Sequence, residues 1–177
     1  MPVMDLRALD FVSHNYEQTL RYGVKLGQLL QPRDLVCLSG QIGAGKTLLS
    51  IGIGRGWGSL EQVTSPSYVL ANEYSRADGA HLHHLDCYRL SHPRDADSIC
   101  LDERLESGAT LIVEWPENIA SSLPDESLWI RIGYVEEEKR NMAMRASGDR
   151  FEQLLSLIHI SEPTRRYAIS YAVFCLK

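Results

Sequence analysis

The sequence predicts an α/β domain with a largely parallel central sheet and helices on both faces. Two short apolar runs, 35–38 and 110–113, have the length and composition of parallel strands buried on both sides. The first run is followed at once by a glycine-rich loop over 40–47 and then by a helix-compatible segment from Lys46. A strand, a glycine loop and a helix in this order predict the βα unit on which such sheets are built.

The other expected elements complete this domain. Apolar and small residues near helical spacing predict a helix over 15–30, before the first strand. The helix after the loop is expected to fray by Gly54, because Gly54, Gly56 and Gly58 are poor helix residues. The remaining elements are a hairpin over 68–87 around an Asp-Gly turn, a mostly helical segment over 91–107, a second hairpin over 128–145 and a helix from about Asp149.

Composition narrows the classes of function. The chain has 177 residues, is 44% hydrophobic and 23% charged, and carries a net charge of −5, values typical of one compact globular domain. Because phosphate contacts need clustered Lys and Arg, an acidic chain without a basic run is not expected to grip DNA or RNA by itself. Its four cysteines form no Cys-x-x-Cys pair. No apolar run is long enough for a membrane span and no signal pattern precedes the domain, so a cytoplasmic protein is expected.

The end of the chain differs from the rest. Residues 156–177 continue no earlier pattern and resemble the translated sequencing-adapter tail that ends some reading frames. We therefore expect a domain over 1–155 followed by a non-native tail over 156–177. The alternative is a genuine terminal strand that packs Ile169, Tyr171 and Val173 against the domain.

The loop over 40–47 predicts the binding of a nucleoside triphosphate, ATP, together with magnesium. Its residues are Gly40, Gln41, Ile42, Gly43, Ala44, Gly45, Lys46 and Thr47. Backbone N–H groups can surround a phosphate only where the chain wraps tightly, and the glycines remove the side chains that would block this. The following helix directs its positive end at the phosphates, Lys46 reaches the β- and γ-phosphates, and the Thr47 hydroxyl binds Mg²⁺.

Two carboxylates are candidates for the rest of such a site. Glu114 comes directly after a buried strand and so is expected at the carboxyl edge of the sheet, where a magnesium-binding acid belongs. Asp86 ends the run 81–85. A surface charge at a strand end is the alternative interpretation of each.

Three histidines in the run 81–85 suggest a zinc site. His81 and His83 share one face of a strand, whereas His84 points to the other. No further ligand of suitable spacing is evident, so partly exposed strand histidines are the preferred interpretation.

Four linked motifs resemble one known family. These are Gly43-Ala44-Gly45-Lys46-Thr47, then Ser65-Pro66-Ser67-Tyr68 with Asn72-Glu73-Tyr74, then His84-Leu85-Asp86-Cys87-Tyr88-Arg89, and Val113-Glu114-Trp115-Pro116-Glu117. In order and spacing they resemble TsaE, also called YjeE, a bacterial ATPase family needed for threonylcarbamoyladenosine beside the anticodon of tRNA. The resemblance runs from about Leu9 to Leu155 and implies the P-loop NTPase fold.

The resemblance also implies roles for individual residues. Asp86 matches an acid important for hydrolysis, acting with Lys46, and Thr47 with Glu114 matches the magnesium ligands. The nucleotide site would further include Ser65 and Pro66 of a switch-like loop, Tyr88, Trp115, His14 and Tyr16 near the adenine, and Arg140.

The implied function is an ATPase that works in complex with TsaD and TsaB. TsaD transfers the threonylcarbamoyl group in that family, so tRNA would be met only through the partners, in agreement with the acidic charge. Two alternatives remain open: a nucleotide-gated binding module whose turnover is incidental, and a small-molecule phosphotransferase.

Overall fold

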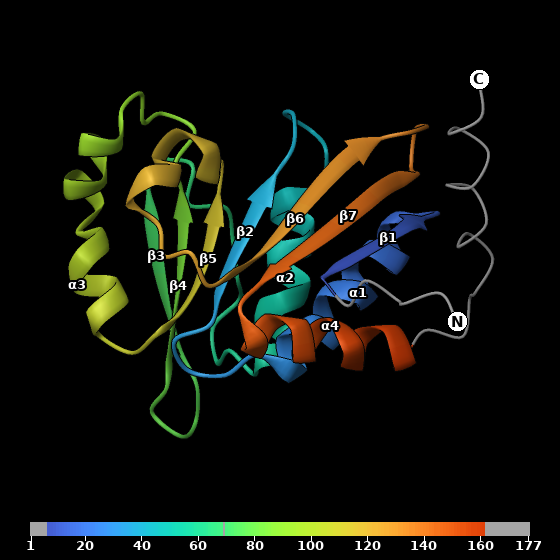
Figure 1. Cartoon of the computed structure of the whole chain (residues 1–177), viewed down its shortest axis with the longest axis horizontal. Helices are drawn as coiled ribbons and strands as arrows, with labels where there is room; N and C mark the ends of the chain where they lie inside the picture. Colours follow the sequence, from blue (N-terminus) through green and yellow to red (C-terminus); the bar gives the residue numbers. More distant parts are fainter. Residues whose placement is uncertain (1–6, 69, 162–177) are drawn as a thin grey trace.

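The computed structural model describes residues 7–68 and 70–161 and places them around one seven-stranded sheet (Figure 1). The strands are β1 Ala8–Ser13, β2 Leu35–Ser39, β3 Ala71–Ser75, β4 His81–Asp86, β5 Thr110–Glu114, β6 Ser127–Tyr134 and β7 Arg140–Ser147. The helices are α1 Tyr16–Leu29, α2 Lys46–Trp57, α3 Leu101–Glu106 and α4 Asp149–Ser161, with 3-10 turns η1 Pro93–Ile99 and η2 Pro116–Ser122. None of the helices in the described ranges has the length and apolar character that a membrane span requires.

The centre of the sheet is parallel and its margins are antiparallel. The strand order is β1-β7-β6-β2-β5-β4-β3, in which β6, β2, β5 and β4 run parallel to one another. The hairpin β3–β4 closes one side, and β7 with β1 closes the other. Both expected hairpins and the parallel centre are confirmed, whereas β1 was not predicted.

The buried strands explain why helices cover both faces. Along β2, Val36 and Leu38 point into a core shared with α1, α2 and α4, whereas Leu35 and Cys37 point into a core shared with α3, η1 and η2. A five-residue strand without a polar face can be stable only when both of its sides are covered. The predicted three-layer arrangement is therefore confirmed.

Helix α2 extends past the point at which it was expected to fray. It continues through Gly54 and Gly56 to Trp57, and Gly58 ends it with a left-handed φ of 93°. The reason is helix packing: a methyl group built on Gly56 would overlap the backbone of Val24 in α1, and one on Gly27 would overlap Ile53. Glycine lets the two helices touch backbone to backbone, and this burial outweighs glycine's poor intrinsic helix propensity.

One further expectation needs correction: the extended segment begins at Ala71 rather than Tyr68, because Leu70 adopts a left-handed φ of 66° that interrupts a strand. The final helix runs over Asp149–Ser161, and Ile158 is 4% exposed within the core. Residues 162–177, with the proposed packing of Ile169, Tyr171 and Val173, lie outside the described residues.

Candidate nucleotide-binding site

The loop over 40–47 joins the end of β2 to the start of α2, at the carboxyl edge of the parallel strands. Gly43 and Gly45 have φ values of 78° and 107°, which strain any residue with a side chain. A Cβ atom added at either position would have no atom within 4 Å, so open space lies over the loop. Helix α2 then begins at Lys46 and directs its N-terminal N–H groups toward this space.

The Lys46 side chain folds back onto the loop that precedes it. Its Nζ donates to the carbonyl oxygens of Gly40 at 2.5 Å and Gln41 at 3.0 Å, and it lies 4.0 Å from the centroid of the Trp115 ring. Burial lowers the pKa of the Lys46 ammonium, against the opposing effects of Glu114, Glu117 and Asp86. The Lys46 ammonium is bound here by neutral carbonyls and one aromatic face. Its hydrogen bonds to a charged phosphate would be stronger than these contacts, so the exchange is favourable.

Glu114 ends β5 and faces the first turn of α2. Its Oε2 accepts a hydrogen bond from the Thr47 hydroxyl at 3.3 Å, and its Oε1 accepts one from Ser50 at 3.1 Å. Oε1 also lies 2.8 Å from Nε2 of His84 on the neighbouring strand β4. The hydroxyl and the carboxylate expected to bind magnesium are thus in direct contact, and both are oxygen donors of the kind that this ion prefers.

Asp86 ends β4, in parallel register with Glu114 at the end of β5. It is 4% exposed, and both of its oxygens are engaged: Oδ1 accepts from the N–H of Tyr88 at 2.9 Å and Oδ2 from the Ser67 hydroxyl at 2.7 Å. The segment that contains Ser65 and Ser67 is therefore attached to this carboxylate. The two candidate acids lie side by side because adjacent parallel strands end at the same edge.

These groups line one open cleft of about 520 Å³. Its walls include the predicted residues Ile42, Gly43, Gly45, Lys46, Thr47, Ser65, Asp86, Tyr88, Glu114 and Trp115. Of the other predicted residues, Gly40 and Gln41 hold Lys46, while Ala44, Pro66, His14, Tyr16 and Arg140 do not line the cleft. Sequence reasoning missed Arg89 as a lining residue, although it follows Tyr88 directly within a motif already singled out.

Arg140 contacts the glycine loop but does not line the cleft. It is 5% exposed, and its Nε donates to the Ala44 carbonyl at 2.9 Å. One terminal nitrogen donates to the carbonyls of Glu136 and Lys139, both at 2.9 Å, and of Glu137 at 3.1 Å. The guanidinium lies between the exposed rings of Tyr16 and Tyr134, at 5.9 and 5.0 Å from their centroids. His14 follows Ser13, which pairs with Arg140 in the β1–β7 register, and its backbone N–H donates to the Gln18 side chain at 2.6 Å.

Comparison with known proteins agrees with this geometry. Residues 13–142 match the family model described as threonylcarbamoyl adenosine biosynthesis protein TsaE. This chain belongs to the TsaE family. A TsaE protein of Streptomyces coelicolor is 40% identical over 135 residues, which are 73% of this chain and 90% of the relative. A TsaE protein of Bacillus subtilis is 31% identical over 150 residues, which are 84% and 92% of the two chains.

A solved structure supports the fold. The crystal structure of YdiB from Bacillus subtilis superposes with a TM-score of 0.72 at 28% identity, covering 87% of this chain and 95% of that one. The predicted P-loop NTPase fold and the resemblance to TsaE are both confirmed. Because such a fold implies nucleotide binding, the cleft at the loop over 40–47 is the candidate nucleotide site of this TsaE-family chain.

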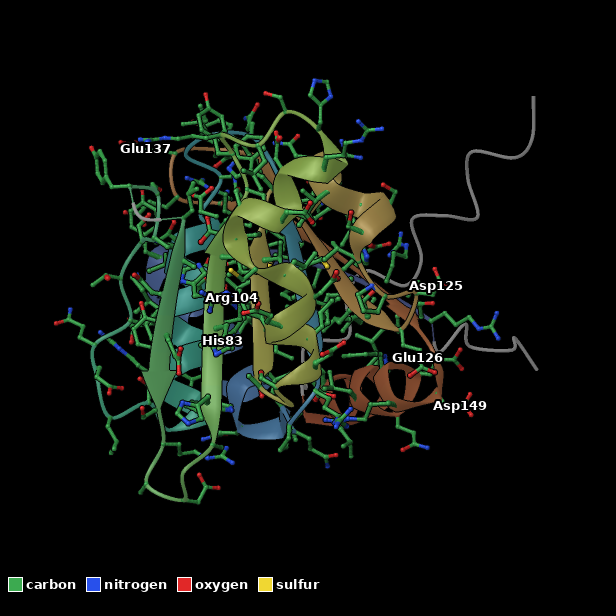
Figure 2. All side chains as sticks on the ribbon, turned by 90° about the vertical axis from the view of Figure 1, so that its left-hand side faces the viewer. His83, Arg104, Asp125, Glu126, Glu137 and Asp149 are labelled. Atoms are coloured by element: carbon green, nitrogen blue, oxygen red, sulfur yellow. The ribbon has the colours of Figure 1, made fainter. Side chains whose placement is uncertain are left out.

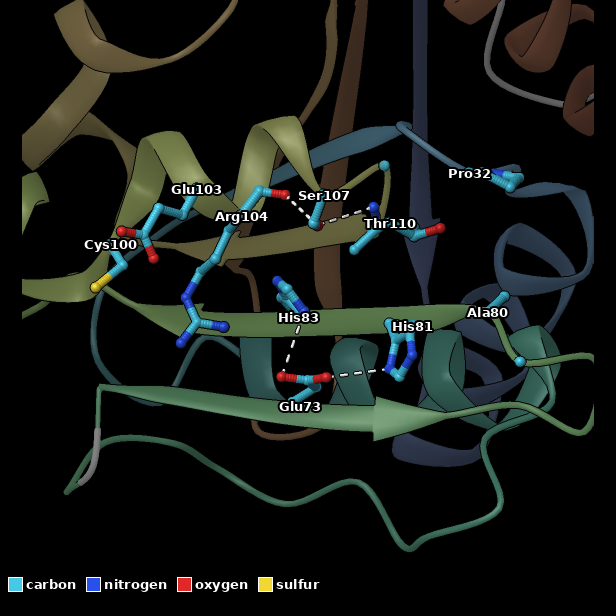
Figure 3. Close-up of a pocket in the computed structure, with 13 residues that line it drawn as sticks. Pro32, Glu73, Ala80, His81, His83, Cys100, Glu103, Arg104, Ser107 and Thr110 are labelled. Atoms are coloured by element: carbon cyan, nitrogen blue, oxygen red, sulfur yellow. Dashed lines mark hydrogen bonds and ion pairs between the residues drawn. The ribbon is translucent and has the colours of Figure 1, made fainter.

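The histidines of β4 lie on both faces of the strand, as expected. They are not all partly exposed, because two of the three are buried. His84 is 0% and His83 is 6% exposed, whereas His81 is exposed. Figure 2 places His83 and Arg104 together beside α3, and Figure 3 shows Glu73 between His81 and His83. Nδ1 of His81 lies 3.0 Å and Nε2 of His83 lies 3.6 Å from the Glu73 carboxylate. Within the described ranges, no group of three or more His, Cys, Asp or Glu residues is arranged to hold a metal ion.

Proposed function

We propose that this chain is the magnesium-dependent ATP hydrolase of tRNA threonylcarbamoyladenosine biosynthesis, acting in the cytoplasm in complex with TsaD and TsaB. The observation that carries the proposal is the convergence of Lys46, Thr47, Asp86 and Glu114 on one cleft in a member of the TsaE family. A P-loop hydrolase needs a lysine for the phosphates, a hydroxyl and an acid for the metal, and a polar group for water. The cleft contains one candidate for each role.

The phosphates would be bound by the loop itself. The backbone N–H groups at the start of α2 face the open space over Gly43 and Gly45. Lys46 would leave the carbonyls of Gly40 and Gln41 and donate to the phosphate oxygens instead. This exchange would leave the charged amine hydrogen-bonded both before and after the nucleotide binds.

Thr47 and Glu114 would hold magnesium, which when bound neutralises charge on the phosphates. The charges in the cleft favour a metal requirement: Asp86 and Glu114 are buried carboxylates, Lys46 is a buried cation that interacts with both, and Arg89 also lines the cleft. A triphosphate placed beside two carboxylates is repelled by them, and a bound metal cation would reduce this repulsion. Oxygen ligands from a hydroxyl and a carboxylate suit Mg²⁺.

Asp86 would orient the attacking water and accept its proton. In the conformation described here Ser67 donates to Oδ2 and the Tyr88 N–H donates to Oδ1. Each carboxylate oxygen can accept a further hydrogen bond, and movement of the segment over 65–68 would remove the Ser67 donor from Oδ2. A partner that moves this segment would change how Asp86 holds the water, which would make hydrolysis slow alone and faster in the complex.

The surface around the cleft is consistent with a partner that carries the RNA. Ile42, Tyr68 and Tyr88 at the rim are 72%, 87% and 52% exposed. Exposed apolar groups gathered at one site are typical of protein contacts. The net charge of −5 opposes direct binding to tRNA.

Reconstitution of the modification with purified TsaD, TsaB and tRNA tests the proposal. An Asp86→Ala protein should still bind ATP and its partners but should fail to support repeated rounds of threonylcarbamoyladenosine formation. Full support by that variant would favour a nucleotide-gated binding module instead. Transfer of labelled phosphate to a small acceptor, rather than to water, would favour a phosphotransferase. If the wild-type chain joins neither partner with or without ATP, the partner assignment is wrong.

A further inference from the structure

A fully buried histidine stands directly behind the carboxylate assigned to magnesium. His84 on β4 is 0% exposed, and its Nε2 lies 2.8 Å from Oε1 of Glu114 on β5. Because an ionised carboxylate can only accept hydrogen bonds, the hydrogen on Nε2 points at Oε1. Nδ1 is buried as well and has no hydrogen-bond partner among the residues the structure describes. Among the described residues, the hydrogen bond to Glu114 is thus the polar contact of the His84 ring.

The two oxygens of Glu114 have different surroundings. Oε1 faces two donors, His84 at 2.8 Å and Ser50 at 3.1 Å, and lies on the inner side of the site. Oε2 faces the hydroxyl of Thr47 at 3.3 Å, a residue that lines the cleft. The inner oxygen is therefore already satisfied, while the outer oxygen is the one available to a cation in the cleft.

We infer that His84 is a positioning residue, which fixes the rotation of the Glu114 carboxylate so that Oε2 faces the magnesium site. The inference rests on the proposed function, since it assigns a task within the same site. Hydrogen bonds to a metal-binding carboxylate orient it, and their loss typically weakens metal binding or activity by about 10–100-fold. Without His84, the carboxylate could rotate toward the ammonium of Lys46.

The same hydrogen bond also ties the two acidic strands together. His84 and Asp86 lie two residues apart on β4 and so project to the same face of the sheet. In the parallel register, Asp86 pairs with Glu114. A contact from β4 to the Glu114 side chain therefore holds the water-orienting acid and the metal-binding acid at a fixed separation.

The variant His84→Leu separates a positioning role from simple packing. A leucine would fill a similar volume and remove the buried Nδ1, which has no partner among the described residues. It would also remove the shortest hydrogen bond to the buried Glu114 carboxylate, so a lower melting temperature alone does not distinguish the two roles. Thr47 and Ser50 remain as donors to Glu114, although the Ser50 hydroxyl also lies 3.1 Å from the Lys46 carbonyl oxygen. The positioning role predicts in addition that metal-dependent binding is lost while metal-free affinity is kept.

The experiment compares nucleotide binding with and without magnesium by calorimetry, using a non-hydrolysable ATP analogue. The metal contribution is the ratio of the affinity in Mg²⁺ to the affinity in EDTA. For His84→Leu we expect this ratio to fall about 10–100-fold while metal-free affinity stays within about two-fold. His84→Gln, whose amide nitrogen can occupy the place of Nε2, should restore most of the ratio. The matched control is His83→Leu, on the other face of β4, which should leave the ratio unchanged.

Three results would overturn the inference: a wild-type ratio in His84→Leu, equal ratios in the Leu and Gln variants, or a parallel loss of metal-free affinity and melting temperature. If His84→Leu does not fold, His84→Asn replaces it, since its shorter amide cannot reach Oε1. Equal ratios for the Asn and Gln variants would then overturn the inference. A wild-type chain that does not bind the analogue with Mg²⁺ would instead refute the proposed function.

Discussion

Replacing Gly56 by alanine should destabilise the protein, although helix propensity alone predicts the opposite. An alanine within a helix is favoured over glycine by about 1 kcal/mol. Gly56 lies in α2 against α1, and a Cβ atom built there would overlap the carbonyl oxygen of Val24 and would be 2.7 Å from its carbonyl carbon. The obstacle is backbone, so it cannot move aside as a flexible side chain would.

The size of the effect follows from that geometry. Ordinary contacts of a Cβ begin at 3.4 Å, so the clash with the Val24 carbonyl carbon alone would require α1 and α2 to separate by about 0.7 Å, and the clash with the carbonyl oxygen would require more. Overpacking of this kind typically costs about 1–3 kcal/mol, and more where the backbone must shift. After subtraction of the propensity gain, we expect a net loss of about 2 kcal/mol. For a domain of this size that corresponds to a melting temperature lower by about 4–8 °C.

Thermal and urea unfolding followed by circular dichroism measure this loss. Gly133→Ala is the matched control, because a Cβ atom there would meet its nearest neighbour, the Asn141 carbonyl oxygen, only at 3.9 Å. That variant should be neutral or slightly stabilised. If Gly56→Ala is as stable as the wild type or more so, the close approach of α1 and α2 does not limit this position and the packing argument is wrong.

Three further outcomes can be measured directly. Lys46→Met should weaken ATP binding by about 100-fold, equivalent to about 3 kcal/mol for lost charged hydrogen bonds, in a calorimetric titration. Arg140→Lys should lower the free energy of unfolding, measured in urea, by about 2–3 kcal/mol and should weaken ATP binding. The reason is that an ammonium cannot reproduce the forked contacts of the guanidinium with the carbonyls of Ala44 and of residues 136–139. An unchanged free energy of unfolding would contradict the supporting role of Arg140. Burial, with the charge of Asp86, raises the pKa of the Cys87 thiol to about 12, and burial likewise raises that of Cys37. Above the ordinary thiol pKa of 9.0 the unfolded state loses these protons and the folded state keeps them, so stability should fall as pH rises toward about 12. Among the cysteines that the structure describes, iodoacetamide should modify exposed Cys100 before buried Cys37 and Cys87.

The sequence predicted the elements whose signal is local. The strand over 35–38 and the glycine loop could be read from a few adjacent residues, because burial on both faces and phosphate binding each impose a composition on a short segment. The position of Glu114 at the edge of the sheet followed from the same reasoning. Strand β1 was missed because its pairing partner, β7, lies 127–137 residues away along the chain and its own residues only partly alternate.

The errors occurred where distant contacts override a local preference. Gly54 and Gly56 are poor helix residues, yet they lie within α2 because Val63 packs against Gly54 and helix α1 packs against Gly56. Nor does the run 81–85 reveal that His84 contacts Glu114, thirty residues further along the chain. An alternating strand shows which residues share a face, but it does not show which neighbouring strand they meet.

The end of the domain provides a last prediction, for which two truncations are informative. Stopping the chain after Leu155 would cut α4 in the middle and remove Ile158, which is 4% exposed in the core with Leu154 and Phe151. Loss of a buried isoleucine and the final turns should cost about 2–5 kcal/mol. Stopping after Ser161 keeps the helix, and if residues 162–177 belong to the predicted non-native tail over 156–177, the melting temperature of this form should equal that of the full chain. A lower melting temperature in the longer truncated form would show that the tail is part of the folded protein.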